Sequence, residues 1–196
     1  MDSSSRNSRE PFRLAGLAAA VSLLLGSAAA AQAGEQSHNF VLTAYSNGRG
    51  GPDLLSGNYA AADKVLHYRA SLSAFDGSSS SNNRCIALAM TKQWDAARTA
   101  CDEAVRDAEH EKASLPSYQY WARKLENDYV AVALSNRAVF HWMSADSAAA
   151  AADLKRAATL SPNADFVARN QSALEYSRTA VAQTKVAQVD VAAKSP

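Results

Sequence analysis

The stretch "LSNRAVFHWMSADSAAAAADLKRAATLSP", from Leu134 to Pro162, decides the fold because it holds two helices and the turn between them. Asp146 is a favourable N-cap for a second helix over Ser147–Leu160, and the proline that follows stops that helix. Five consecutive alanines, at positions 148–152, raise its helix propensity. Only Ala150 among them is expected to need its small side chain, because its spacing predicts contact with the preceding helix.

The landmarks of this stretch also occur earlier in the chain. In both copies, a small residue two positions after an asparagine lies 12 residues before an alanine, and further landmarks follow at +4 and +3. The first copy comprises Asn83, Cys85, Ala97, Cys101 and Ala104, and the second comprises Asn136, Ala138, Ala150, Leu154 and Ala157. Asn170, 34 residues after Asn136, is a third occurrence of the asparagine. Alanine richness alone does not explain identical offsets.

These landmarks resemble the tetratricopeptide repeat, a 34-residue helix–turn–helix unit. The resemblance covers about residues 54–180, and Leu134–Pro162 matches best. Arg84 and Arg137 depart from it, because leucine is common at that position of the family. The resemblance implies an all-α fold, a short right-handed stack of antiparallel helix pairs (a TPR-like α-solenoid) with a C-terminal capping helix. A plain alanine-rich helical bundle is the alternative.

Apolar spacing and cap residues predict six helices. Their expected ranges are 59–70, 82–92, 94–113, 117–143, 147–160 and 166–181. Asn83 and Asn136 are 53 residues apart, which is 19 more than one repeat. We assign the extra residues to a lengthening of the third and fourth helices into an elongated helical arm, which extends about 12–15 Å beyond the stack. The alternative is a loose loop, against which the helical spacing of Leu125, Tyr129 and Val132 argues.

Residues 1–33 have the pattern of a secretory signal peptide. Arg6, Arg9 and Arg13 precede an apolar stretch, and small residues lead up to Ala33. We therefore expect cleavage after Ala33 and export, with the periplasm as the compartment. An uncleaved membrane anchor is the alternative. The rest of the chain divides into an irregular N-terminal segment (34–53), a TPR-like helical domain (54–181) and a flexible C-terminal tail (182–196).

The charge balance, the histidine spacing and the absence of catalytic motifs argue against several classes of function. The chain has 20 basic and 19 acidic residues, and residues 1–33 carry three and two of these, so 17 of each remain. This balance, without a basic stripe, disfavours nucleic acid as a partner. The four histidines show no metal-ligand spacing, so no metal site is predicted. No nucleophile elbow, phosphate loop or nucleotide fingerprint is present, and therefore neither catalysis nor a cofactor is expected.

The chain has two cysteines, Cys85 and Cys101, on the two predicted helices of one unit. In an oxidising compartment they can form a disulfide. Cys-x-x-Cys spacing is absent, which argues against a catalytic redox pair. The alternative is that both are buried free thiols at small contact positions. The sequence does not decide between a disulfide and free thiols, because disulfide formation depends on the geometry of the two residues.

The resemblance places the first helix of each unit on a concave surface, where Asn83 and Asn136 begin the inner faces. An asparagine amide both donates and accepts, so it can bind the main chain of a peptide. The expected peptide-binding residues are Asn83, Ile86, Met90, Asn136, Val139, Trp142 and Met143. The alternative is that each asparagine ties neighbouring helices together.

The resemblance also implies a structural ion pair between Arg137 and Asp153, on the paired helices of one unit. Arg84 stands at the equivalent place of the earlier unit, but Ala100 stands where its acid would be. Its partner is therefore not predicted.

The sequence thus favours an exported protein-binding or peptide-binding module or scaffold without catalysis of its own. Its partner is a protein or peptide of unknown identity. Self-association through the arm, as a structural envelope protein, is the second hypothesis. An enzyme with an unrecognised site is the third.

Overall fold

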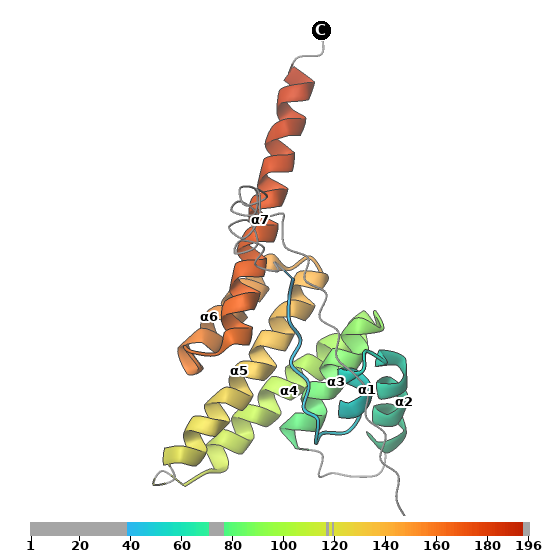
Figure 1. Ribbon diagram of the computed structural model, residues 1–196, viewed down its shortest axis with the longest axis vertical. Helices are drawn as coiled ribbons and strands as arrows, with labels where there is room; N and C mark the ends of the chain where they lie inside the picture. Colours follow the sequence, from blue (N-terminus) through green and yellow to red (C-terminus); the bar gives the residue numbers. More distant parts are fainter. Residues whose placement is uncertain (1–38, 71–76, 117, 119, 194–196) are drawn as a thin grey trace, which may run out of the picture. The chain divides into compact units, whose positions relative to one another are not determined.

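The computed structural model of the chain describes residues 39–70, 77–116, 118 and 120–193. Within these residues it contains seven α-helices and no strand (Figure 1), which confirms the all-α prediction. The helices are α1 (Gly51–Leu55), α2 (Tyr59–Ala70), α3 (Ser78–Met90), α4 (Trp94–Ser114), α5 (Tyr120–Met143), α6 (Ser147–Leu160) and α7 (Asp165–Ala193). The expected leader, residues 1–33, lies outside the described residues.

The same turn joins α1 to α2, α3 to α4 and α5 to α6. In each turn a residue with a left-handed backbone stands two positions before the second helix: Gly57 (φ 78°), Lys92 (φ 61°) and Ala145 (φ 65°). The next residue donates its main-chain N–H to the carbonyl five positions back, which is the Schellman pattern. These bonds are Asn58 to Asp53 (2.8 Å), Gln93 to Leu88 (3.0 Å) and Asp146 to His141 (2.8 Å). The six helices are therefore three pairs of one local design.

Helix α6 has the predicted bounds, and the Asp146 carboxylate caps it by accepting from Ala149 N at 3.0 Å. Helix α3 instead begins four residues before its predicted start. Its first turn is capped from α4, because Glu111 accepts from Ser78 N at 2.7 Å and from Ser78 Oγ at 2.6 Å. A cap supplied from another helix left no local signal in the sequence.

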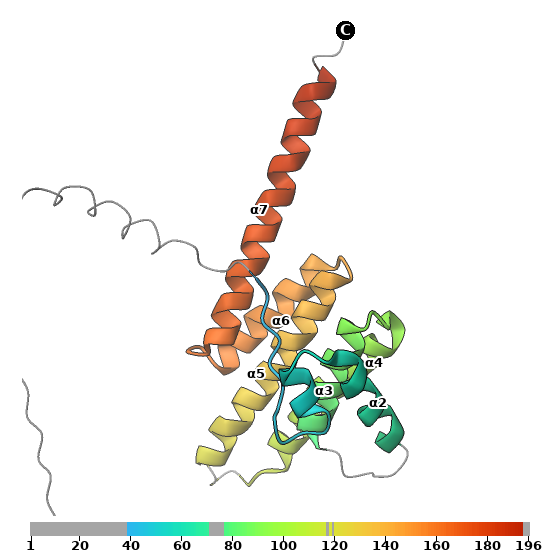
Figure 2. The ribbon, with the colours of Figure 1, turned by 45° about the vertical axis from the view of Figure 1, so that its right-hand side comes forward.

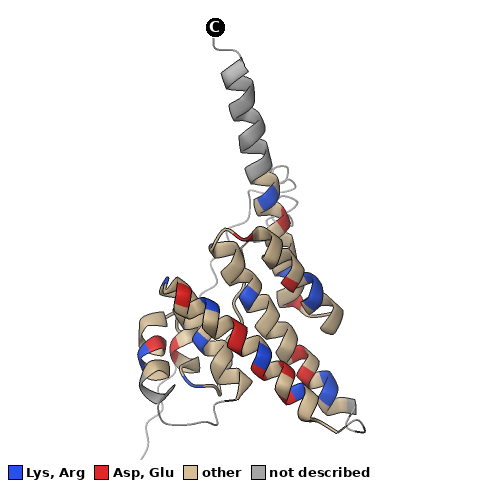
Figure 3. Ribbon diagram, turned by 180° about the vertical axis from the view of Figure 1, so that it is seen from behind, with Lys and Arg blue, Asp and Glu red and all other residues tan. Residues whose placement is uncertain are grey.

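The inserted residues lengthen α4 and α5, as predicted. These helices have 21 and 24 residues, against 13 in α3 and 14 in α6. They lie side by side and antiparallel in both views (Figures 1 and 2). Helix α5 begins at Tyr120 rather than at the predicted residue 117, and Pro116 lies in the connection between α4 and α5. Acidic and basic residues are intermixed along α4 and over the first part of α5 (Figure 3).

Part of the lengthened α4 packs against α3. Asp107 accepts from Ser81 Oγ at 2.5 Å, one turn before the Glu111 cap of α3. The part of the arm near the connection between α4 and α5 carries exposed apolar side chains, at Tyr118, Trp121 and Leu125.

Alanine fills the contacts between helices. Ala138 of α5 and Ala150 of α6 are both 0% exposed and belong to one cluster with Leu154 and Leu174. Along α4, four alanines at helical spacing are equally buried, at positions 97, 100, 104 and 108. The predicted contact register between α5 and α6 is therefore present.

Cys85 of α3 and Cys101 of α4 are joined by a disulfide, with an S–S distance of 2.04 Å. Both residues are buried. The bond closes a loop with a sequence separation of 16, for which the chain-entropy model gives a stabilisation of about 3 kcal/mol. Of the two alternatives that the sequence left open, the structure has the disulfide.

Helix α7 continues to Ala193, whereas the sequence predicted a flexible tail from residue 182. Residues 182–193 contain no glycine or proline, and several are alanine, so nothing in this part breaks a helix that is already formed. Helix α7 contacts α5 and α6. Among the described helices, none is long and apolar enough to cross a membrane.

Candidate peptide-binding site

Residues 40–45 form an extended segment that crosses α3 and α5, the first helices of two successive pairs, and the last helix α7 (Figures 1 and 2). From the sequence this run can be a strand or an extended segment, within the irregular region 34–53, and its position against the helices is not predicted. We call residues 40–45 the extended segment.

Three asparagines hold the main chain of the extended segment, one at every second residue. Each amide accepts from the N–H of a residue through Oδ1 and donates to the carbonyl of the same residue through Nδ2. The pairs are Asn170 with Val41 (2.6 and 2.9 Å), Asn136 with Thr43 (2.9 and 2.9 Å) and Asn83 with Tyr45 (2.9 and 2.9 Å). We call these three asparagines, at 0–1% exposure, the asparagine ladder.

The asparagine ladder forms because the two-residue repeat of the extended segment matches the spacing of the helices that it crosses. Residues two apart in an extended chain present their main-chain groups on the same edge. Asn83, Asn136 and Asn170 come from α3, α5 and α7, and these three helices bond residues 45, 43 and 41 of the segment in turn. All six bonds go to the main chain, and the ladder therefore recognises an extended backbone rather than particular side chains.

The ladder asparagines also tie neighbouring helices together. Asn136 Nδ2 donates to Asn82 Oδ1, and Asn170 Nδ2 donates to Ser135 Oγ, both at 2.8 Å. Asn82 and Ser135 each come directly before the ladder asparagine of the preceding unit. Asn82 Nδ2 donates in addition to Thr43 O at 3.0 Å. Main-chain binding and the tying of neighbouring helices, the two alternatives for the asparagines, thus occur together.

A tight turn ends the extended segment. Gly48 N donates to Tyr45 O at 3.1 Å, and Asn83 Nδ2 donates to Arg49 O at 3.0 Å. A side chain at Gly51 would place its Cβ 2.2 Å from Tyr45 O, so only glycine fits where α1 begins. The segment is therefore fixed closely to the first helix pair.

Side chains on the two flanks of the segment pack against the helices that it crosses. Leu42 and Ala44 pack against a buried cluster that includes Ile86. Ile86, which was predicted to contact a peptide, is therefore covered by the chain's own segment. On the other flank Tyr45 lies 5.3 Å from Tyr129 between ring centroids, and burial raises the pKa of Tyr45 above its ordinary value.

An open pocket of about 610 Å³ remains beside the extended segment. Four predicted peptide-binding residues line it, namely Met90, Val139, Trp142 and Met143. The other lining residues are Asn39, Phe40, Leu42, Tyr59, Ala173, Tyr176 and Ser177. None of the lining residues is charged, and the ring of Phe40 lies 4.3 Å from that of Trp142. The arrangement suits an uncharged, bulky apolar group.

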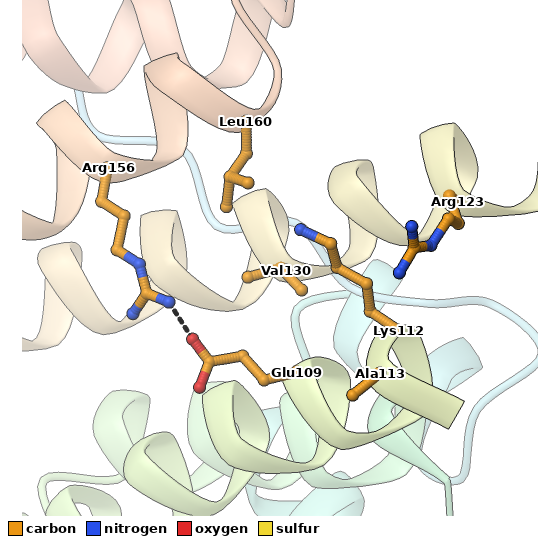
Figure 4. Close-up of a pocket in the computed structure, with 7 residues that line it drawn as sticks. All are labelled: Glu109, Lys112, Ala113, Arg123, Val130, Arg156 and Leu160. Atoms are coloured by element: carbon orange, nitrogen blue, oxygen red, sulfur yellow. Dashed lines mark hydrogen bonds and ion pairs between the residues drawn. The ribbon is translucent and has the colours of Figure 1, made fainter. Parts of the chain in front are cut away.

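A second pocket, of about 370 Å³, lies between α4, α5 and α6 and has a different character (Figure 4). Lys112, Arg123, Arg156 and Glu109 line it together with apolar residues. Arg156 donates to Glu109 Oε1 within this pocket, which joins α6 to α4. Because an ion pair already occupies it, this pocket suits an apolar side chain less well than the one beside the segment.

The predicted ion pair of Arg137 with Asp153 is present. Arg137 Nε and Nη2 donate to the two carboxylate oxygens of Asp153, both at 2.8 Å, and Nη1 donates to Asp102 at 2.9 Å. Hydrogen bonding to Asp153 raises the pKa of Arg137, although burial opposes this. Arg84, whose partner the sequence did not predict, lies 3.5 Å from Glu103, one turn beyond Ala100. Both pairs are structural and join the helices of a pair.

His141 is expected to make the protein less stable as the pH falls from about 7 to 5. Burial lowers the pKa of His141 below 6.5 and outweighs the attraction of Asp153, whose Oδ2 lies 3.7 Å from Nε2. Below pH 6.5 the unfolded chain therefore binds a proton that the folded chain resists, and the free energy of unfolding falls. Chemical denaturation at pH 7, 6 and 5 should show a flatter pH dependence for His141→Gln. An equal flattening in His110→Gln, which changes an exposed histidine, would contradict this assignment.

Within the described residues, no three histidine, cysteine or acidic side chains come together as a metal site would need. Comparisons of the chain with protein families, with curated proteins and with solved structures found no match.

Proposed function

We propose that this chain is a protein-binding or peptide-binding module of the tetratricopeptide type, without catalysis of its own. Three helix pairs with one turn design, equivalent asparagines at 53-residue and 34-residue spacing, and small residues between α5 and α6 support a short right-handed stack closed by α7. In such a stack the first helices line the binding face. This is the face on which the extended segment lies.

One observation carries the proposal. The inner face already holds an extended polypeptide through its main chain, and it leaves an uncharged pocket of about 610 Å³ open beside that polypeptide. Binding sites for peptides combine main-chain hydrogen bonds with a pocket for a bulky side chain. The pocket contains Trp142, which is 38% exposed and so is partly available to a partner.

We also propose that the module works outside the cytoplasm after removal of residues 1–33. The disulfide between Cys85 and Cys101 supports this location, because such bonds persist in oxidising compartments. The charge pattern before the apolar stretch supports it independently.

Selection from a random dodecapeptide display library against residues 34–196 tests the proposal. We expect enrichment of peptides with a bulky apolar residue, and a loss of affinity of about 10-fold or more in Trp142→Ala, because aromatic anchors dominate such interfaces. Affinity is measured by fluorescence anisotropy, and circular dichroism checks that the variant folds.

Trp121→Ala is the matched control, since Trp121 is 77% exposed on the arm and does not line the pocket. It should leave the affinity unchanged. No enrichment, or an equal loss in both tryptophan variants, would show that this pocket is not a peptide-binding site.

A further inference from the structure

The extended segment has two main-chain edges, and the asparagine ladder uses only one. Residues 41, 43 and 45 face the ladder. In an extended chain the N–H and C=O groups of the alternate residues face the opposite edge. These groups belong to Phe40, Leu42 and Ala44, and no side chain or main chain among the described residues hydrogen-bonds to them. We call this the free edge.

The free edge belongs to residues that are not buried. All three of its residues are partly exposed, and the ladder bonds hold the opposite edge against the helices. Unpaired main-chain groups of a strand edge are a template for another extended chain. Their two-residue repeat, about 6.6–7 Å, is matched by the same repeat in a second strand and not by a helix.

The uncharged pocket lies on the same flank of the segment as the side chains of the free edge. Phe40 and Leu42 both line it, and Tyr59, Met90 and Trp142 close it from α2, α3 and α5. Side chains of a second strand would alternate between the two flanks. Every second one would therefore face the pocket, and its lining favours a bulky apolar side chain over a charged one.

We propose that a partner polypeptide adds to the free edge as a second extended strand and places a bulky apolar side chain in the uncharged pocket. The chain's own segment thus serves as a fixed strand that is extended by the partner rather than displaced from the ladder. This inference rests on the proposed peptide-binding function and specifies how the peptide binds.

Amide hydrogen exchange of residues 34–196, followed by NMR with and without a dodecapeptide from the display selection, tests the binding mode. The amides of Leu42 and Ala44 should exchange at least about 10-fold more slowly with peptide bound, because they gain hydrogen bonds. The amides of Val41, Thr43 and Tyr45 should stay protected throughout, because the ladder keeps them.

Loss of protection at Val41, Thr43 and Tyr45 on peptide binding would mean displacement, and it would overturn the added strand while leaving the proposed function intact. Unchanged exchange at Leu42 and Ala44 would mean that the peptide uses the pocket alone, with the same consequence. Protection of Leu42 and Ala44 without peptide, in a chain that is dimeric by light scattering, would make a second copy the occupant and also overturn the proposal.

Ala44→Pro supplies a test by mutation. Proline removes the N–H on the free edge and leaves the N–H groups that bond the ladder in place. We expect at least a 10-fold weaker affinity for the selected peptide, whereas Ala44→Ser, which keeps the N–H, should bind as the parent chain does. Equal affinities in a folded Ala44→Pro variant would exclude the added strand. If that variant does not fold, the exchange measurement on the parent chain decides.

Discussion

Asn136→Ala is expected to lower the free energy of unfolding by about 3 kcal/mol, because two buried polar groups lose their partner and each costs about 1–3 kcal/mol. The Thr43 N–H loses its acceptor, and Asn82 Oδ1 loses its donor. Thr43 O keeps one bond, from Asn82 Nδ2, which limits the loss. Chemical denaturation at pH 7 measures the change.

Asn127→Ala is the matched control for this prediction. Asn127 lies on the same helix, α5, but its buried Oδ1 has no hydrogen-bond partner among the described residues. Its replacement should cost less than about 0.5 kcal/mol, as for substitutions that break no specific interaction. Equal losses in the two variants would show that the ladder bonds add nothing beyond the helix itself.

The prediction also reports on the extended segment. In the Asn136→Ala variant, Thr43 is held only through its carbonyl, which accepts from Asn82 Nδ2. Amide exchange at Thr43 should therefore become faster, while exchange within α3 should change little at the same fraction folded. A uniform increase over the whole chain would indicate global destabilisation rather than a local release of the segment.

The sequence predicted those parts of the fold that depend on nearby residues. Helix α2 and helix α6 have their predicted bounds, since their caps and apolar spacing lie within the helices and the turns before them. The contact of Ala138 with Ala150 followed from fixed offsets within one helix pair. Asn83 and Asn136 were identified in the same way, from their place in the unit, and Asn170 from its repeat distance.

Features that depend on distant residues could not be placed from the sequence. The extended segment has no period that distinguishes it from a loop, and its ladder partners lie 38, 93 and 129 residues away. Glu111 caps α3 from 33 residues away. Asn82 and Ser135 could have been found, because each stands directly before a ladder asparagine and offers a hydrogen-bonding side chain at the same position of two units. The continuation of α7 was missed because apolar faces, rather than the absence of helix breakers, were used to predict its end.

Among the five alanines of the opening stretch, Ala150 is the one at which leucine should be most costly. Ala150 is 0% exposed between α5 and α6, in contact with the cluster of Ala138, Leu154 and Leu174. Added methyl and methylene groups have no space there, so Ala150→Leu should lower the free energy of unfolding by about 3 kcal/mol, the upper part of the range for overpacked cores.

The neighbouring alanines make this a test of register rather than of helix propensity. Leucine and alanine differ little in propensity, so any large difference between positions must come from packing. Ala149 is partly buried and Ala148 is exposed, and we therefore expect a smaller loss in Ala149→Leu and almost none in Ala148→Leu. Thermal and chemical denaturation of the three variants should give losses that fall in the order 150, 149, 148. A different order would place another face of α6 against α5, and the 12-residue offset between Ala138 and Ala150 would then not mark the contact between these helices.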